Sequence, residues 1–353
     1  MQLRLSTLLA AAVLAAAPAR AQSPAPPVSQ DELVRRLAAT LDSLSARDEF
    51  SGVVVLARGG TPVWERAYGM ADREARRPND VETAFNLGSI NKAFTQIAVR
   101  QLEAAGKIQL DSTLAFHWPD YPNQEVARRV TIRQLLQHRS GIGGNIFGDP
   151  PGGSRASIRR LRDFLPLFVD EPLQFDPGSS QRYSNAGYVV LGLLVERLSG
   201  EDYYDYVRRH VYQPAGMTRT AHFAVDTLPP NTAIGYTRGG PGSAGDGPLR
   251  RNTQELPGRG SSAGGGYSTA HDLMRFVQAL RERKIPNGPP AGIGIAGGSG
   301  GINGVVEGDL PGGYDLIVLA NLDPPAAERI ARTVRGWLGA ADDGPGQQRR
   351  PGS

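Results

Sequence analysis

The regular hydrophobic pattern of the chain opens with leucines at helical spacing. Residues 30–47 place four of them on one face: Leu33, Leu37, Leu41 and Leu44. This spacing predicts an amphipathic helix. Two strands are expected next, at residues 50–56 and 63–69, before the candidate serine.

Strands return only near the carboxyl end. Residues 302–307 and 314–321 form apolar runs, followed by a predicted helix at 325–338. Between the two strand regions, apolar residues follow helical spacing, most clearly at 189–198. This order predicts an α+β fold with an antiparallel sheet built from both ends of the chain and flanked by helices. A helical subdomain at about 106–269 would lie beside the sheet, with a cleft between them.

Domain boundaries follow from composition. Residues 1–21 are typical of a secretory signal peptide, with Arg4 before an apolar run and a small-residue site ending at Ala21. Cleavage there would leave one domain at 22–339 and a disordered tail at 340–353. No later stretch is apolar enough to span a membrane. We therefore expect a periplasmic or secreted protein.

Charge and residue content exclude several kinds of function. The formal net charge of +4 falls to +2 when Arg4 and Arg20 leave with the signal peptide, and the basic residues are scattered. No nucleic-acid partner is expected. The chain has no cysteine, and its histidines show no His-x-x-x-His pair, so neither a metal site nor another cofactor is predicted.

Ser89-Ile90-Asn91-Lys92 carries the clearest chemical signal. The serine and the lysine lie three residues apart at the expected start of a helix, so both side chains share one helical face. A lysine held partly out of water binds its proton less tightly and can help to take the proton of the serine. The pair predicts acyl transfer through a serine ester.

Tyr183-Ser184-Asn185 lies just before the apolar helical run. A tyrosine phenol can share or relay the proton of a serine, and an asparagine amide can hold a substrate carbonyl. The same triplet also fits a structural role, in which Tyr183 packs and Ser184 or Asn185 caps the helix. Taken alone, it favours that structural role.

In this order, the two motifs resemble the penicillin-recognising serine hydrolases, namely class C β-lactamases, D-alanyl-D-alanine carboxypeptidases and related esterases. The resemblance covers about residues 50–323 and includes the leucine-leucine-x-His-x-Ser-Gly segment at 135–141 and the glycine-rich segment at 264–269. It implies the β-lactamase/transpeptidase-like fold. Within the 135–141 segment, His138 is expected to have a structural role, as a cap or a hydrogen-bonding group.

The resemblance also assigns roles to individual residues. It implies that Ser89 is the nucleophile and that Lys92 shares its proton. Tyr183 would be the second basic group, and Asn185 would contact the substrate carbonyl. Which of Lys92 and Tyr183 is the principal base stays open.

The third motif of the family is incomplete. Relatives carry a lysine or histidine, one variable residue and a glycine on a strand facing the serine, and the best counterpart is Ile295-Ala296-Gly297-Gly298. The N–H groups of Gly298 and Ser89 can still form an oxyanion hole, because backbone donors need no particular side chain. Ile295 replaces the cation that would bind a substrate carboxylate. Three arginines remain as substitutes: Arg250, Arg251 and Arg259.

These observations predict an exported serine hydrolase that acts through Ser89 on a small-molecule ester, amide or peptide. The missing cation favours esterase-like activity. The alternatives are a β-lactamase or D-alanyl-D-alanine carboxypeptidase, and a catalytically weak family member that binds cell-wall peptides. A long glycine- and proline-rich segment at 239–266 is expected to be either a lid over the site or disordered.

Overall fold

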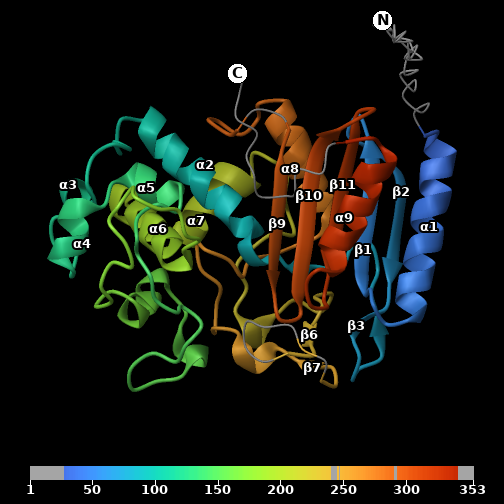
Figure 1. Ribbon diagram of the computed structural model, residues 1–353, viewed down its shortest axis with the longest axis horizontal. Helices are drawn as coiled ribbons and strands as arrows, with labels where there is room; N and C mark the ends of the chain where they lie inside the picture. Colours follow the sequence, from blue (N-terminus) through green and yellow to red (C-terminus); the bar gives the residue numbers. More distant parts are fainter. Residues whose placement is uncertain (1–27, 240–244, 246, 290–291, 341–353) are drawn as a thin grey trace, which may run out of the picture.

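A five-stranded antiparallel sheet forms one half of the protein, with the helical subdomain beside its β9 edge (Figure 1). The computed structural model describes residues 28–239, 245, 247–289 and 292–340. The strand order is β2-β1-β11-β10-β9, so the sheet combines strands from both ends of the chain, as predicted. Its strands are β1 (Gly52–Arg58), β2 (Thr61–Tyr68), β9 (Gly294–Ser299), β10 (Ile302–Leu310) and β11 (Tyr314–Ala320).

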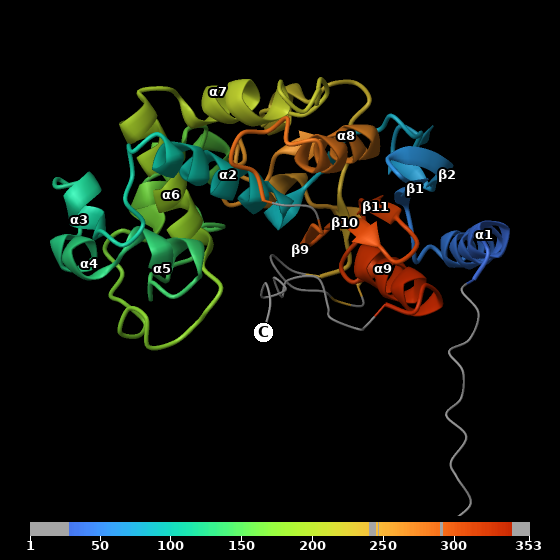
Figure 2. The same ribbon diagram turned by 90° about the horizontal axis from the view of Figure 1, so that it is seen from above.

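Helices cover both faces of the sheet because side chains alternate along its strands. On β1, Val53 and Val55 join the hydrophobic cluster beneath one face, whereas Val54 and Leu56 join the cluster on the other. Figure 2 shows α8 over the first face, and α1 and α9 together over the second. These helices are α1 (Gln30–Ala46), α8 (Ala270–Arg281) and α9 (Ala326–Trp337).

The helical subdomain packs around α6 (Asn185–Ser199), which is buried along most of its length. Ser184 caps this helix by accepting a hydrogen bond from Gly187 N at 3.0 Å, so α6 begins earlier than the apolar run at 189–198 indicated. The surrounding helices are α2 (Asn91–Ala104), α3 (Leu114–His117), α4 (Gln124–Arg129), α5 (Ile132–Leu136) and α7 (Tyr203–Val207). Two longer helices, α2 and α6, and several short ones thus make up this region.

Three two-stranded ladders connect the loops around the main sheet. They pair β3 (Met70–Asp72) with β4 (Arg77–Pro78), β5 (Phe85–Asn86) with β8 (Tyr267–Ser268), and β6 (Tyr236–Thr237) with β7 (Arg250–Arg251). The segment predicted as a long loop therefore contains a strand, and a 3-10 turn follows at Thr253–Glu255. Ser261 and Ser262 are buried, so this part of the segment belongs to the packed structure.

Several expectations concern residues outside the described part of the chain. The predicted signal peptide at 1–21 lies there, as do the predicted tail from 341 onward and positions 240–244 and 246 of the expected loop. Within the described residues, no helix is both long enough and apolar enough to cross a bilayer.

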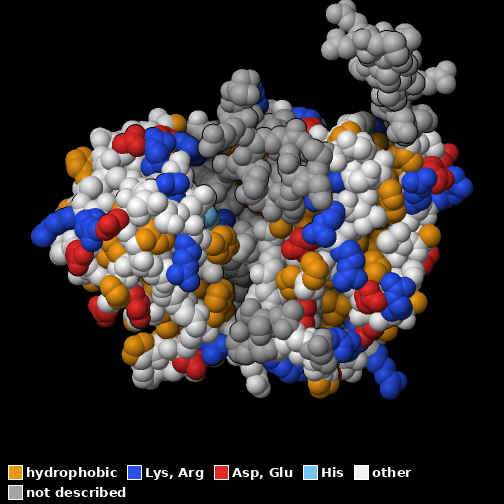
Figure 3. Space-filling model, in the orientation of Figure 1, with side chains coloured by type: hydrophobic (Ala, Val, Ile, Leu, Met, Phe, Trp, Pro, Cys, Tyr) orange, Lys and Arg blue, Asp and Glu red, His pale blue; other side chains and the backbone are white. Residues whose placement is uncertain are grey.

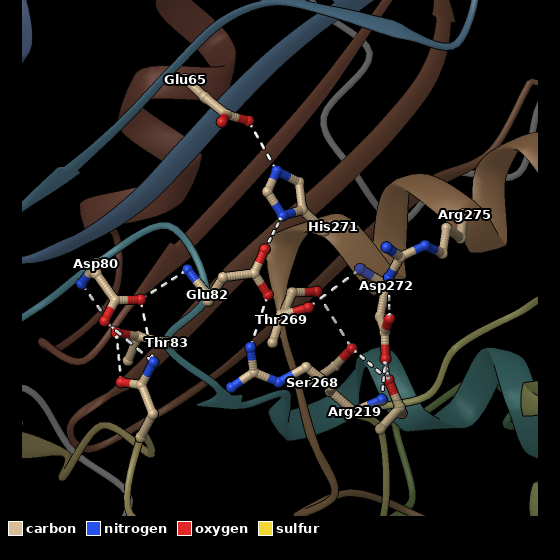
Figure 4. Close-up of polar contacts among 12 residues, drawn as sticks. Glu65, Asp80, Glu82, Thr83, Arg219, Ser268, Thr269, His271, Asp272 and Arg275 are labelled. Atoms are coloured by element: carbon tan, nitrogen blue, oxygen red, sulfur yellow. Dashed lines mark hydrogen bonds and ion pairs between the residues drawn. The ribbon is translucent and has the colours of Figure 1, made fainter.

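A polar cluster joins α8 to β2 and to the turn before β5 (Figure 4). His271, near the start of α8, contacts Glu82 through Nδ1 at 2.5 Å and Glu65 through Nε2 at 2.7 Å. Burial lowers the pKa of His271, but the two carboxylates outweigh burial and leave the pKa above its usual value. Burial raises the pKa of Glu82, and His271 and Arg219 reverse this effect.

We predict that the contribution of His271 to stability depends on pH. Because its pKa is raised on folding, this contribution is fully present below about pH 6.5 and disappears as the pH rises through the folded-state pKa. Glu82 has a lowered pKa, so its contribution disappears as the pH falls through that lower value. His271→Gln should therefore cost ~1 kcal/mol near about pH 6 and clearly less near about pH 9. Urea unfolding at the two pH values measures this, and an equal loss at both would contradict it.

Candidate functional site

A cleft separates the β9 edge of the sheet from the helical subdomain. Figure 3 shows the hollow between the two halves of the molecule. Ser89, Asn185 and Gly298 all line it. Its apolar lining residues include Ile146, Phe147, Phe164, Val225, Leu256 and Pro257. Three of the predicted site residues therefore line one cleft.

Ser89 lies in the 3-10 turn Gly88–Ile90, which leads directly into α2. Its Oγ is 2.5 Å from Tyr183 Oη and 3.2 Å from Lys92 Nζ. The spacing of Ser89 and Lys92 places both side chains on one face of this turn, as the sequence predicts. Tyr183 comes from the loop before α6 and completes a group of three polar atoms.

Lys92 is 5% exposed, and three acceptors surround its nitrogen. Nζ donates to Ala263 O at 2.5 Å and to Asn185 Oδ1 at 2.7 Å, and its third contact is with Ser89 Oγ. Burial lowers the pKa of Lys92 to about 7, because removing an ammonium group from water disfavours its charged form. Near neutral pH, a substantial fraction of this side chain is therefore an uncharged amine.

The ring of His138 packs against the ring of Tyr183. The two rings stack with their centres 4.7 Å apart, and the His138 ring stacks on Tyr188 at 4.9 Å. His138 Nδ1 accepts the Ser184 N–H at 3.1 Å, which agrees with its predicted structural role. Desolvation raises the pKa of Tyr183, and its hydrogen bond to Ser89 offsets part of that rise. The phenol therefore keeps its proton at neutral pH.

The backbone of β9 lies directly against the serine turn. A methyl group added at Gly297 would lie 2.4 Å from Leu87 O and 2.8 Å from Ser89 N. One added at Gly88 would lie 3.2 Å from Gly298 N. Only glycine permits this approach, and it brings the two expected oxyanion donors, Ser89 and Gly298, to one end of the cleft.

Among the described residues, each of the three arginines expected as substitutes for the missing cation already has a partner. Arg251 pairs with Asp72 and Glu74, and the Arg259 guanidinium stacks 3.7 Å above the Tyr204 ring. Arg250 pairs with Glu255, and Glu255 is the one charged side chain among the described residues that line the cleft. Within the described part of the chain, no cluster of His, Asp or Glu residues could hold a metal ion.

The family model for beta-lactamases matches residues 34–340. The chain belongs to the beta-lactamase family. Esterase EstB from Burkholderia gladioli is 34% identical over 286 residues, which cover 70% of each chain. Penicillin-binding protein 4* from Bacillus subtilis is 30% identical over 188 residues, or 53% of this chain and 41% of that protein. The chain spans 56% of the putative penicillin-binding protein PbpX of B. subtilis and 41% of penicillin-binding protein 4*, so it matches only part of the length of either relative.

Solved structures share the fold. The penicillin-binding protein from Bacillus halodurans superimposes with a TM-score of 0.72 at 30% identity, over 84% of this chain and 98% of the other. D-amino acid amidase from Ochrobactrum anthropi has a TM-score of 0.71 at 22% identity, covering 87% and 98%. These likenesses confirm the predicted β-lactamase/transpeptidase-like fold.

Sequence reasoning missed two parts of this beta-lactamase-family site. The Ala263 carbonyl that holds Lys92 is a backbone group, so no residue type marks it. Glu255 is a single acidic residue in a segment without a regular hydrophobic pattern, so the sequence does not indicate that its side chain lines a cleft. The helix cap predicted for Ser184 or Asn185 is confirmed at Ser184, while Tyr183 and Asn185 contact Ser89 and Lys92 and their functional roles stay predictions.

We predict that Gly297→Ala disrupts the contact between β9 and the serine turn. The added methyl group would overlap Leu87 O, and overpacking of this kind costs ~1–3 kcal/mol. Gly294→Ala is the matched control on the same strand, because its methyl group would meet no atom within 4 Å. It should change stability by less than about 0.5 kcal/mol. Chemical denaturation of both variants tests this, and equal stabilities would contradict it.

Proposed function

We propose that the protein hydrolyses esters, and small amides, through an acyl-enzyme on Ser89. The observation that carries this proposal is the contact of Ser89 Oγ with both Lys92 Nζ and Tyr183 Oη, beside a cleft with apolar lining residues. A serine hydroxyl is a weak nucleophile until a neighbouring base takes its proton. The site therefore has a nucleophile, a base and room for an acyl group.

Lys92 is the proposed base. Two of its N–H groups are held by Asn185 Oδ1 and Ala263 O, which leaves one position on Nζ directed at Ser89 Oγ. In the ammonium form this position carries a proton, and in the amine form it carries a lone pair. The pKa of Lys92 is lowered to about 7, so its amine can accept the serine proton near neutral pH. The pKa of Tyr183 is raised, so its phenol stays protonated at neutral pH and cannot act as the base.

The proposed reaction proceeds in two stages. Ser89 Oγ bonds to the substrate carbonyl carbon while its proton passes to Lys92 Nζ, and the N–H groups of Ser89 and Gly298 hold the resulting oxyanion. The bond to the leaving alcohol or amine then breaks, and that group receives the proton through the Tyr183 hydroxyl. A water molecule attacks the acyl-enzyme in the same way and releases the acid and free Ser89.

Charge in the cleft favours neutral substrates. The resemblance implies that Ile295 stands where relatives carry a cation, and Glu255 is the one charged side chain among the described residues that line the cleft. Glu255 holds Arg250 in an ion pair, so this arginine is not free to bind a substrate carboxylate. An apolar acyl group, by contrast, fits against Phe147 and Phe164. Esters of apolar acids are thus favoured over penicillins or peptides that end in D-alanine, which carry a carboxylate. The similarity to esterase EstB supports this choice.

Export is part of the same proposal. The signal-like segment at residues 1–21, although outside the described part of the chain, supports a periplasmic or secreted enzyme.

We predict that kcat/KM for a neutral nitrophenyl ester rises about tenfold per pH unit below about pH 7 and levels off above it, since only neutral Lys92 can accept the proton. A titration of labelled lysines by NMR should give a matching pKa for Lys92. The chain has only two other lysines, Lys107 and Lys284, which serve as exposed references.

Two variants complete this test. Lys92→Arg should lower kcat by at least about 100-fold, because arginine stays charged. Ser89→Ala should abolish turnover. Lys107→Arg is the matched control and should behave as wild type. A flat pH profile, or an active Lys92→Arg variant, would contradict the assignment of the base.

We also predict that Glu255 sets the preference for uncharged substrates. For two matched esters that differ by one carboxylate, wild type should favour the neutral ester. Glu255→Gln removes the negative charge and releases Arg250, so it should raise relative activity on the anionic ester by about fivefold, or ~1 kcal/mol. Added salt should shrink the difference between the esters. Glu74→Gln, on a carboxylate that pairs with Arg251, is the control; an unchanged ratio in Glu255→Gln would contradict the prediction.

A further inference from the structure

β9 needs an anchor that its own sequence does not supply. It is the edge strand of the sheet, bonded to β10 on one side only, and it contains Gly294, Gly297 and Gly298. Glycine gives a strand no side chain to pack and leaves its backbone the most freedom. Nevertheless, this strand carries the Gly298 N–H, which must be held in place if it is to stabilise an oxyanion.

Asn303 provides a fixed contact to this strand. It lies opposite Gly298 in the β9–β10 register, and its side chain is completely buried. Its Nδ2 donates to Gly297 O at 3.2 Å and to Glu328 Oε1 at 2.9 Å, and its Oδ1 accepts from Ala327 N at 2.6 Å. The amide therefore ties β9 to the start of α9, on the side of the sheet away from the helical subdomain.

The geometry of the peptide bond links this contact to the cleft. Gly297 O and Gly298 N belong to one planar trans peptide, in which the C=O and N–H groups point in opposite directions. Holding the oxygen against Asn303 thus directs the N–H toward the other side, where the serine turn lies close to Gly298 N. We propose that Asn303 is a positioning residue, which orients the Gly297–Gly298 peptide so that its N–H faces the oxyanion. This proposal rests on the function proposed above.

The effect of Asn303 variants on kcat distinguishes a positioning role from a purely structural one. Asn303 also caps α9 through Ala327 N, so its loss lowers stability in either case. If its amide orients the oxyanion donor, variants that remain folded should also lose kcat, while KM changes little, because the donor acts mainly on the transition state. Removing one oxyanion donor outright costs about 100- to 1,000-fold in kcat, so a displaced donor should cost about 10- to 100-fold.

The experiment compares Asn303→Ala and Asn303→Ser with wild type, using a neutral oxygen ester and the corresponding thionoester. Asn303→Ser removes the amide donor without placing a buried charge beside Glu328, so it remains informative if the alanine variant does not fold. Sulfur accepts hydrogen bonds poorly, so a well-placed donor favours the oxygen ester. The control is Asn79→Ala, which removes another buried amide, bonded to Tyr68 O at 2.8 Å and remote from the cleft.

We expect both Asn303 variants to lose about 10- to 100-fold in kcat, with KM within about threefold of wild type, and to show a lower ratio of oxygen-ester to thionoester turnover. Asn79→Ala should lose stability but keep kcat and this ratio. Asn303 variants that are folded, less stable and unchanged in both readouts would overturn the positioning role. Wild-type protein that turns over neither ester would instead overturn the proposed function itself.

Discussion

The site depends on keeping the Lys92 nitrogen out of water while giving it three acceptors. An unpaired ammonium group in the interior would be very costly, so the fold supplies partners from three places: Ser89 before α2, Asn185 at the start of α6, and the Ala263 carbonyl. Two of these contacts are compatible with either the amine or the ammonium form. The third, to Ser89, is where gain or loss of the proton takes place. Burial thus lowers the pKa of Lys92 without leaving either form unsatisfied.

The helical subdomain and the sheet each contribute other parts of the site. The helical subdomain positions Tyr183 and Asn185, because Asn185 begins the largely buried helix α6 and the His138 ring stacks on the tyrosine ring. The sheet contributes a glycine-rich edge that can approach the serine turn closely. The glycines that permit this approach leave the strand backbone with more freedom. The buried amide of Asn303 restricts it by joining the edge strand to α9. The cleft lies at the boundary of the two halves, so its shape depends on both.

Much of this arrangement could be predicted from the sequence. Alternating and helical hydrophobic patterns indicated the sheet from both termini and most of the main helices, because burial of apolar faces dominates those elements. The Ser89–Lys92 spacing was informative because a helix places such residues on one face. Contacts made by backbone atoms, such as Ala263 O, and by isolated polar residues, such as Asn303 and Glu255, could not be predicted. They depend on loops and strands brought together by tertiary packing, which leaves no periodic signal.

The central claim is that Ser89 carries an acyl group during turnover. Rapid acid quenching of the full-length protein during hydrolysis of a short-chain nitrophenyl ester, followed by intact-mass and peptide mass spectrometry, tests it most directly. The account predicts one added acyl group per chain, located on Ser89, present during turnover and gone once substrate is exhausted. Turnover without any acyl adduct, or an adduct on another residue, would contradict the account.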